Sequence, residues 1–146
     1  MTLENLCKVG KLHAHEPSTG EITLLLASAR RSLQDANVTV ISSATRFDKA
    51  YKTIVKSAMV GMLANGYRPA TGEPGHHVTL LQSLPKTVGM PNDQVVILDA
   101  LRKKRNSSDY AGVEIAPSIV DECIQIAEKL LAATIAWLET HRPELV

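Results

Sequence analysis

The feature that most constrains this fold is a long run of apolar side chains at helical spacing near the end of the chain. Residues 118–138 place them three and four positions apart, which is the repeat of one face of an α-helix. Residues 43–65 carry a second wide stripe, and residues 21–37 a third. Aromatic residues make up only 3% of the chain, so the core must consist of Leu, Ile, Val, Ala and Met, which suits helix packing better than a β-sandwich. These patterns predict a bundle of amphipathic helices.

Shorter segments complete the expected fold. We expect helices over residues 2–14 and 76–84, and another from 92 or 93 to about 110, with breaks at 66–75 and 85–91. The expected capping residues are Thr2, Asn37, Ser42 or Ser43, Gly66 and Ser118. Asp48 is expected on an exposed helix face, and no segment predicts a sheet. The prediction is an all-α, up-and-down bundle of four to six helices, forming a single domain over residues 1–146, with one wide stripe covered in a homodimer.

Composition and charge restrict the classes of function. The formal net charge is +1, so any anion site must come from local clustering. Cys7 and Cys123 lie far apart without a metal-ligand spacing, and we expect buried, reduced thiols. His13 and His15 form an H-x-H pair without a third ligand, so we predict neither a metal site nor a cofactor. No signal peptide or membrane-length apolar run occurs, which favours a cytoplasmic protein without a membrane partner.

The densest cationic run of the chain is in the stretch LRKKRNSSDY. In a helix, Arg102, Arg105, Asn106 and Asp109 fall at i, i+3, i+4 and i+7 and share one face, with Tyr110 one turn beyond Asn106. Two guanidinium groups, an amide and a carboxylate on one face can grip a phosphate or organise a polar site. The alternative is a solvated helix end, whose cations complement the negative end of the helix dipole.

A loop rich in glycine and proline, YRPATGEPGHH, leads to a pair of histidines. It contains no phosphate-binding Walker pattern, because no Gly-Lys-Ser/Thr follows its glycines. His76 and His77 open the next helix, and adjacent histidines make a poor chelate. We expect one ring to pack and the other to face solvent, and the alternative is a role in positioning a phosphate or nucleotide.

Several of these pieces, in this order, resemble HEPN domains, which are small helical bundles. The pieces are the helix SATRFDKAYKTIVKSAMVGMLANGYRP, the glycine-rich loop leading into GHHVTLLQSL, the helix ending LRKKRNSSDY, and the long last helix. The likeness as a whole covers the chain from about residue 21 to residue 140. The resemblance implies a bundle that often dimerises, with the motif regions facing a shared cleft. Many members look like metal-independent ribonucleases of toxin or antiviral type, whose R-x4-6-H motif supplies an arginine to grip phosphate and a histidine to help the 2′-hydroxyl attack phosphorus. Other members lack the motif and bind nucleotides or partner proteins.

The sequence departs from that motif at its histidine. Arg105 and Asn106 match its start, but no histidine follows within six residues, and Asp109 and Tyr110 stand in its place. A solvated aspartate has a pKa of about 4, so it is a poor general acid at neutral pH, and its charge repels phosphate. Arg105 and Asp109 could instead form an i, i+4 salt bridge, and a histidine from the 76–77 pair could enter the cleft from another helix.

Three hypotheses follow. The first is a non-catalytic HEPN-like module in which Arg102, Arg105 and Asn106 bind a phosphate of a nucleotide or RNA, or a partner protein, across a homodimer cleft. The second in rank is a structural protein whose polar patch holds the dimer and whose partner is a nucleotidyltransferase antitoxin. The third is a metal-independent endoribonuclease in which Arg105, beside Asn106, holds phosphate, and Tyr110, Asp109 or a histidine of the 76–77 pair assists.

Overall fold

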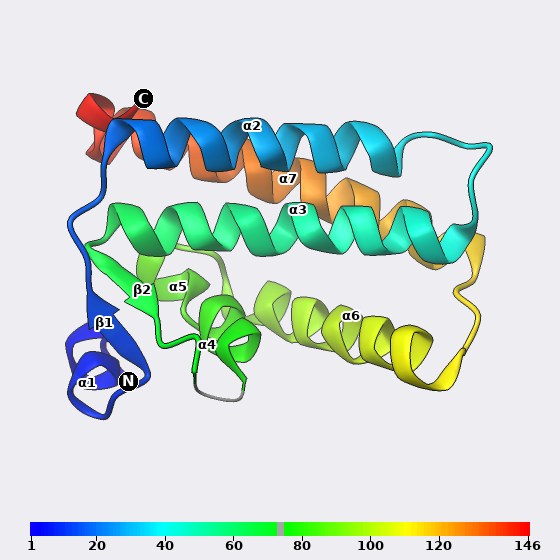
Figure 1. The fold of residues 1–146 in the computed structure, drawn as a ribbon, viewed down its shortest axis with the longest axis horizontal. Coiled ribbons are helices and arrows are strands. Elements are labelled where there is room, and N and C mark those ends of the chain that lie inside the picture. Colours follow the sequence, from blue (N-terminus) through cyan, green and yellow to red (C-terminus); the bar gives the residue numbers. More distant parts are fainter. Residues whose placement is uncertain (73–74) are drawn as a thin grey trace.

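Four long helices form the frame of the computed structural model, which describes residues 1–72 and 75–146 (Figure 1). They are α2 (Thr19–Ala36), α3 (Ser43–Ala64), α6 (Asn92–Ala111) and α7 (Pro117–His141). Helix α3 lies in the middle and packs against α2 and α7, while α6 lies along another side of it. The predicted all-α bundle is therefore confirmed. No helix in the described part of the chain is long and apolar enough to cross a membrane.

Short elements close the bundle at the end where the chain begins (Figure 1). They are α1 (Leu3–Lys8), β1 (Leu12–Ala14), β2 (Tyr67–Pro69), α4 (His76–Gln82), α5 (Leu84–Thr87) and the 3₁₀ turn η1 (Pro143–Leu145). The described residues thus hold seven α-helices, not six, because the expected break at 85–91 begins with the single turn of α5.

Helix boundaries follow the capping chemistry of the sequence. The Ser42 hydroxyl accepts a hydrogen bond from the Thr45 amide at the start of α3, as predicted. Gly66 has a φ of 90°, the left-handed conformation expected after the end of α3. The predicted cap at Ser118 is wrong by two residues. Helix α7 begins at Pro117, whose missing N–H costs nothing at the first helical position.

The core centres on the apolar stripe of α3. Phe47, Tyr51 and Ile54 are buried together with the inward faces of α6 and α7. Gly61, on the same helix, faces the end of α5, where a Cβ atom in its place would come within 2.9 Å of Cγ1 of Val88. The absence of a side chain at Gly61 therefore lets the end of α5 pack closely against α3.

The predicted helix over residues 2–14 forms only in its first part. The prediction that the chain contains no sheet is wrong. Helix α1 ends at Lys8, and Gly10 then adopts a φ of 81°, which a helix interior does not allow. The chain continues as β1, which pairs antiparallel with β2 so that Leu12 lies opposite Pro69. Leu12 is fully buried as part of the core, and the pairing joins two segments far apart in the sequence.

Candidate functional site

The face predicted from LRKKRNSSDY lines a pocket. Helix α6 continues through this stretch to Ala111, so the predicted spacing holds. Opposite it, the start of α4 brings the histidine pair to the same place. The pocket has a volume of about 290 Å³ and is lined by Gly75, His76, His77, Val78, Arg102, Arg105, Asn106 and Tyr110. The structure thus joins two candidate segments that the sequence could only treat separately.

Arg105 is the most connected residue of this pocket. Its Nε lies 3.0 Å from a carboxylate oxygen of Asp109, which is the i, i+4 bridge expected from the sequence. The same Nε lies 3.4 Å from Oδ1 of Asp48 on α3. Its guanidinium also covers the ring of Tyr51, with Cζ 5.6 Å from the ring centroid. Arg105 is therefore held in place by groups on two helices.

Asp48 was not predicted as part of the site. It was expected on an exposed face, but it is half-buried and faces α6. Burial raises the pKa of its carboxyl group, but hydrogen bonds from Lys52 and Arg105 and their positive charges outweigh this, so its pKa lies below the usual value. Asp48 is consequently a stable anion that links α3 to α6.

Arg102 supplies the second guanidinium. Its Nε donates to Oδ1 of Asp99 at 3.0 Å, and Lys103 contacts the other oxygen of the same carboxylate at 3.3 Å. The bond from Arg102 to Asp99 holds the pKa of this carboxyl group below its usual range. A guanidinium has five N–H donors, so contacts through Nε leave Arg102 and Arg105 able to donate toward the pocket.

The two imidazole rings are in contact with each other. Their centroids are 4.6 Å apart in an edge-to-face arrangement, and the ring of His77 also lies 6.1 Å from that of Tyr51. Both residues are half-buried, and the ring of His77 is the one that packs on Tyr51. Burial lowers the pKa of His77, and the nearby His76, Arg105 and Arg102 lower it further. The lowered pKa favours the neutral form of the His77 imidazole.

Tyr51 lies beneath these groups. Sequence periodicity placed it in the apolar stripe, and only 1% of it is exposed. Its hydroxyl is buried and has no hydrogen-bond partner within residues 1–72 and 75–146. Burial raises its pKa to about 12, although Arg105 and Arg102 oppose this. Tyr51 is thus a neutral aromatic support for Arg105 and His77.

The assembled groups suit recognition of an anion with an attached ring. Arg102, Arg105 and the Asn106 amide can donate hydrogen bonds to phosphate oxygens. Tyr110, at the edge of the pocket, is 84% exposed and offers an aromatic face on which a base can stack. Asp109, predicted on the same face, is not among the residues that line the pocket, but its carboxylate contacts Arg105 and so competes with any anion for this guanidinium.

Other sequence candidates lie outside this pocket. The ring of His15 contacts the carboxylate of Glu21 at 2.8 Å, next to the capping box that starts α2. Cys7 is only half-buried, whereas Cys123 is fully buried and burial raises its pKa to about 12. Within the described residues, no three His, Cys, Asp or Glu side chains come together in a group that could hold a metal ion.

A comparison with models of protein families found no match to this chain, and no curated protein matches its sequence. The resemblance to HEPN domains therefore stays a prediction, and the pocket is the feature that points to a function.

Proposed function

We propose that this chain is a non-catalytic, HEPN-like module that binds a phosphate of a nucleotide or RNA in the pocket between α4 and α6, as a homodimer. The observation that carries this proposal is the meeting of Arg102, Arg105 and Asn106 with the histidine pair in one pocket. Arginine forks recognise phosphate oxygens, and each charge-assisted hydrogen bond is worth about 1.5–3 kcal/mol.

The carboxylates around Arg105 favour binding over catalysis. Asp109 stands where the resemblance would place a histidine, and it is paired with Arg105 at 3.0 Å. Its carboxylate neutralises part of the charge of the guanidinium, and no imidazole stands at this position to transfer a proton. Asp48 and Tyr51 fix the guanidinium from below, so a phosphate meets a donor whose position is already set.

A binding assay tests this proposal. The probe is a fluorescently labelled nucleoside 5′-monophosphate, titrated with wild type, Arg105→Gln and Lys104→Gln. Lys104 is an exposed neighbour on the other face of α6 and lines a different pocket, so it controls for the loss of one charge from the same helix. We expect Arg105→Gln to weaken binding by about 10- to 100-fold and Lys104→Gln to leave it nearly unchanged. Equal effects of the two substitutions would remove the support for the pocket.

The ribonuclease alternative is favoured by one observation, the position of both histidines beside Arg105. One imidazole would take the proton of an RNA 2′-hydroxyl as its oxygen attacks phosphorus, and the other would give a proton to the departing 5′-oxygen. The products would be a 2′,3′-cyclic phosphate and a 5′-hydroxyl. Incubation of RNA with EDTA, comparing wild type with His77→Gln and Arg105→Ala, decides this. Cleavage by wild type alone would replace binding with catalysis as the function.

The structural alternative rests on the ion pairs of Arg105. Both of its carboxylate partners, Asp48 and Asp109, belong to the same chain, so this network supports the fold of one protomer. If the network instead holds a dimer for a nucleotidyltransferase partner, Arg105→Ala should dissociate the dimer in sedimentation experiments, and the parent protein should bind no nucleotide. A dimer that survives Arg105→Ala would count against this alternative.

A further inference from the structure

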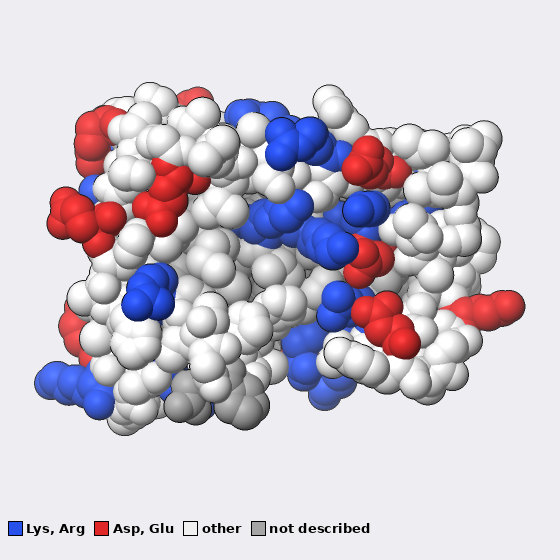
Figure 2. Space-filling model, in the orientation of Figure 1, with Lys and Arg blue, Asp and Glu red and all other residues white. Residues whose placement is uncertain are grey.

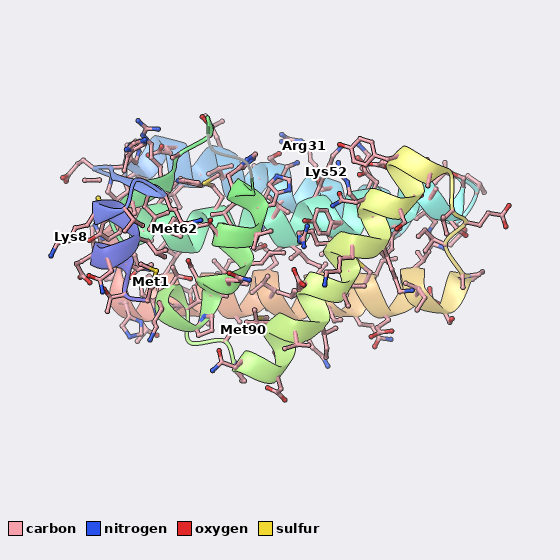
Figure 3. The ribbon with its side chains drawn as sticks, turned by 90° about the horizontal axis from the view of Figure 1, so that it is seen from below. Met1, Lys8, Arg31, Lys52, Met62 and Met90 are labelled. Atoms are coloured by element: carbon pink, nitrogen blue, oxygen red, sulfur yellow. The ribbon has the colours of Figure 1, made fainter. Side chains whose placement is uncertain are left out.

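A row of cations crosses the face of the molecule formed by α2 and α3. Lys49, Lys52 and Lys56 fall at i, i+3 and i+7, so they share one face of α3. Figure 3 shows Arg31 and Lys52 on the same side of the molecule, away from α7, and the charge of Arg31 acts on Lys56. Figure 2 shows the Lys and Arg side chains gathered over the middle of this face. We call Arg31, Lys49, Lys52 and Lys56 the basic band.

The cations of the basic band lie close enough together for their charges to act on one another. The Lys56 ammonium donates to the Ser32 hydroxyl at 2.7 Å across the seam between α2 and α3. Burial lowers the pKa of Lys56, and the charges of Lys52, Lys49 and Arg31 lower it further, with Asp35 opposing them. A chain whose net charge is only +1 thus concentrates positive charge on this face. Such a patch attracts a polyanion.

The basic band joins the pocket through Asp48. One oxygen of this carboxylate lies 2.9 Å from Lys52, and the other lies 3.4 Å from Arg105. Among the residues that the structure describes, the acidic groups that interact with these cations include Asp35 on α2, Asp48 on α3, and Asp99 and Asp109 on α6. Cationic side chains therefore extend from α2 to α6, and carboxylates partly neutralise them.

We infer that this face is the track of a single-stranded polynucleotide, with one phosphate in the α4–α6 pocket and its neighbours along the basic band. Lys49 and Lys56 are separated by about 10 Å along α3, which is too far for one phosphate group to bridge. A chain of phosphates fits such a row. The exposed Tyr110 at the pocket favours a single strand, because its bases are free to stack on an aromatic ring. This inference rests on the proposed phosphate site and names the class of its ligand.

The test compares a short and a long probe on the same proteins. The probes are the labelled nucleoside 5′-monophosphate and a labelled 20-nucleotide single-stranded RNA, with a single-stranded DNA of the same sequence and an RNA duplex as further arms. The variant is Arg31→Gln/Lys49→Gln, which removes two cations of the band without disturbing the Lys52–Asp48 contact. The control is Lys86→Gln/Lys129→Gln, which removes two exposed cations from α5 and α7.

We expect the band variant to bind the monophosphate as wild type does and to lose affinity for the 20-nucleotide RNA. Each phosphate contact on a single strand contributes about 0.7 to the slope of log affinity against log salt, so the slope should fall by about 1.4. The same relation predicts a loss of roughly 10- to 30-fold at about 0.1 M salt. The control variant should change neither value by more than about twofold.

Three results would overturn the inference. Equal losses in band and control variants would mean that only total charge matters. A duplex or a phosphatidylglycerol vesicle that binds more tightly than the single strand, with the same dependence on Arg31 and Lys49, would assign the band to another partner. If Arg105→Gln weakens monophosphate binding but the band variant binds the RNA as wild type does, the polynucleotide track is rejected and the phosphate site in the pocket still stands. Failure of the monophosphate to bind at all would instead reject the proposed function.

Discussion

Neutralising Asp48 should change stability and anion binding in opposite directions. Asp48→Asn keeps the shape of the side chain and removes its charge. In the folded protein this carboxylate contacts Lys52 at 2.9 Å and Arg105 at 3.4 Å. It therefore stabilises the contact between α3 and α6, and it also neutralises part of the guanidinium that a phosphate would use.

The cost in stability follows from the exposure of these ion pairs. The side chains of Asp48 and Arg105 are about one quarter exposed, and that of Lys52 is more exposed. Partly exposed pairs contribute about 0.2–1 kcal/mol each, so Asp48→Asn should lower the free energy of unfolding by roughly 0.5–2 kcal/mol. This contribution depends on pH. Because the pKa of Asp48 is lowered on folding, its stabilisation is present above the unfolded pKa of about 4 and is lost as the pH falls through the folded value.

The gain in affinity follows from Coulomb's law. A carboxylate and a phosphate that contact the same guanidinium are roughly 6–7 Å apart, which gives a repulsion of about 0.6 kcal/mol in water and about 2.5 kcal/mol at an effective dielectric constant of ~20. Because the Asp48 site is partly exposed, the lower half of this range applies. Asp48→Asn should therefore tighten phosphate binding by about 3- to 10-fold.

Urea unfolding followed by circular dichroism measures the first effect, and titration of the labelled nucleoside 5′-monophosphate measures the second. Glu128→Gln, at an exposed position of α7, removes one negative charge far from the pocket and serves as the control. It should change both quantities little. A variant Asp48→Asn that is destabilised but binds the probe as wild type does would refute the reasoning, since Asp48 would then not compete for Arg105.

Three further predictions concern packing, pH and thiol reactivity. Gly61→Ala should lower the free energy of unfolding by about 1 kcal/mol, because overpacking against Val88 outweighs the gain of about 1 kcal/mol in helix propensity; Gly20→Ala, whose Cβ meets nothing within 4 Å, should not lower it in the same urea assay. Binding of a dinucleotide should strengthen as the pH falls toward the pKa of His77, which lies below its ordinary value, because a bound phosphate favours the protonated ring, and His77→Gln should remove this dependence in a titration series. Cys123 should react with a thiol reagent only after unfolding, because it is buried and its pKa is raised to about 12; reaction in the native protein, located by mass spectrometry, would contradict this.

Local patterns account for the parts of the fold that the sequence predicted. An apolar stripe at helical spacing is a property of one segment, so the helices over 43–64 and 117–141 were expected almost to their ends. The caps at Ser42 and Gly66 followed from the chemistry of neighbouring residues. The strand at Leu12–Ala14 was missed, because its partner is β2, far along the chain, and three residues are too few to show a pattern of their own.

The candidate site likewise combines contacts within one helix, which the sequence predicted, with contacts between helices, which it did not. Spacing within one helix was enough to place Arg102, Arg105 and Asn106 on a shared face and to predict the bridge from Arg105 to Asp109, because these contacts lie within two turns of α6.

Only the tertiary structure brought the histidine pair to that face, set Asp48 and Tyr51 beneath Arg105, and aligned Arg31 of α2 with the lysines of α3. Those contacts depend on how three or four helices pack, and packing is fixed by the burial of whole apolar faces rather than by any local repeat. The sequence alone therefore determined which groups could bind phosphate, and the packing of the helices decided which of them meet.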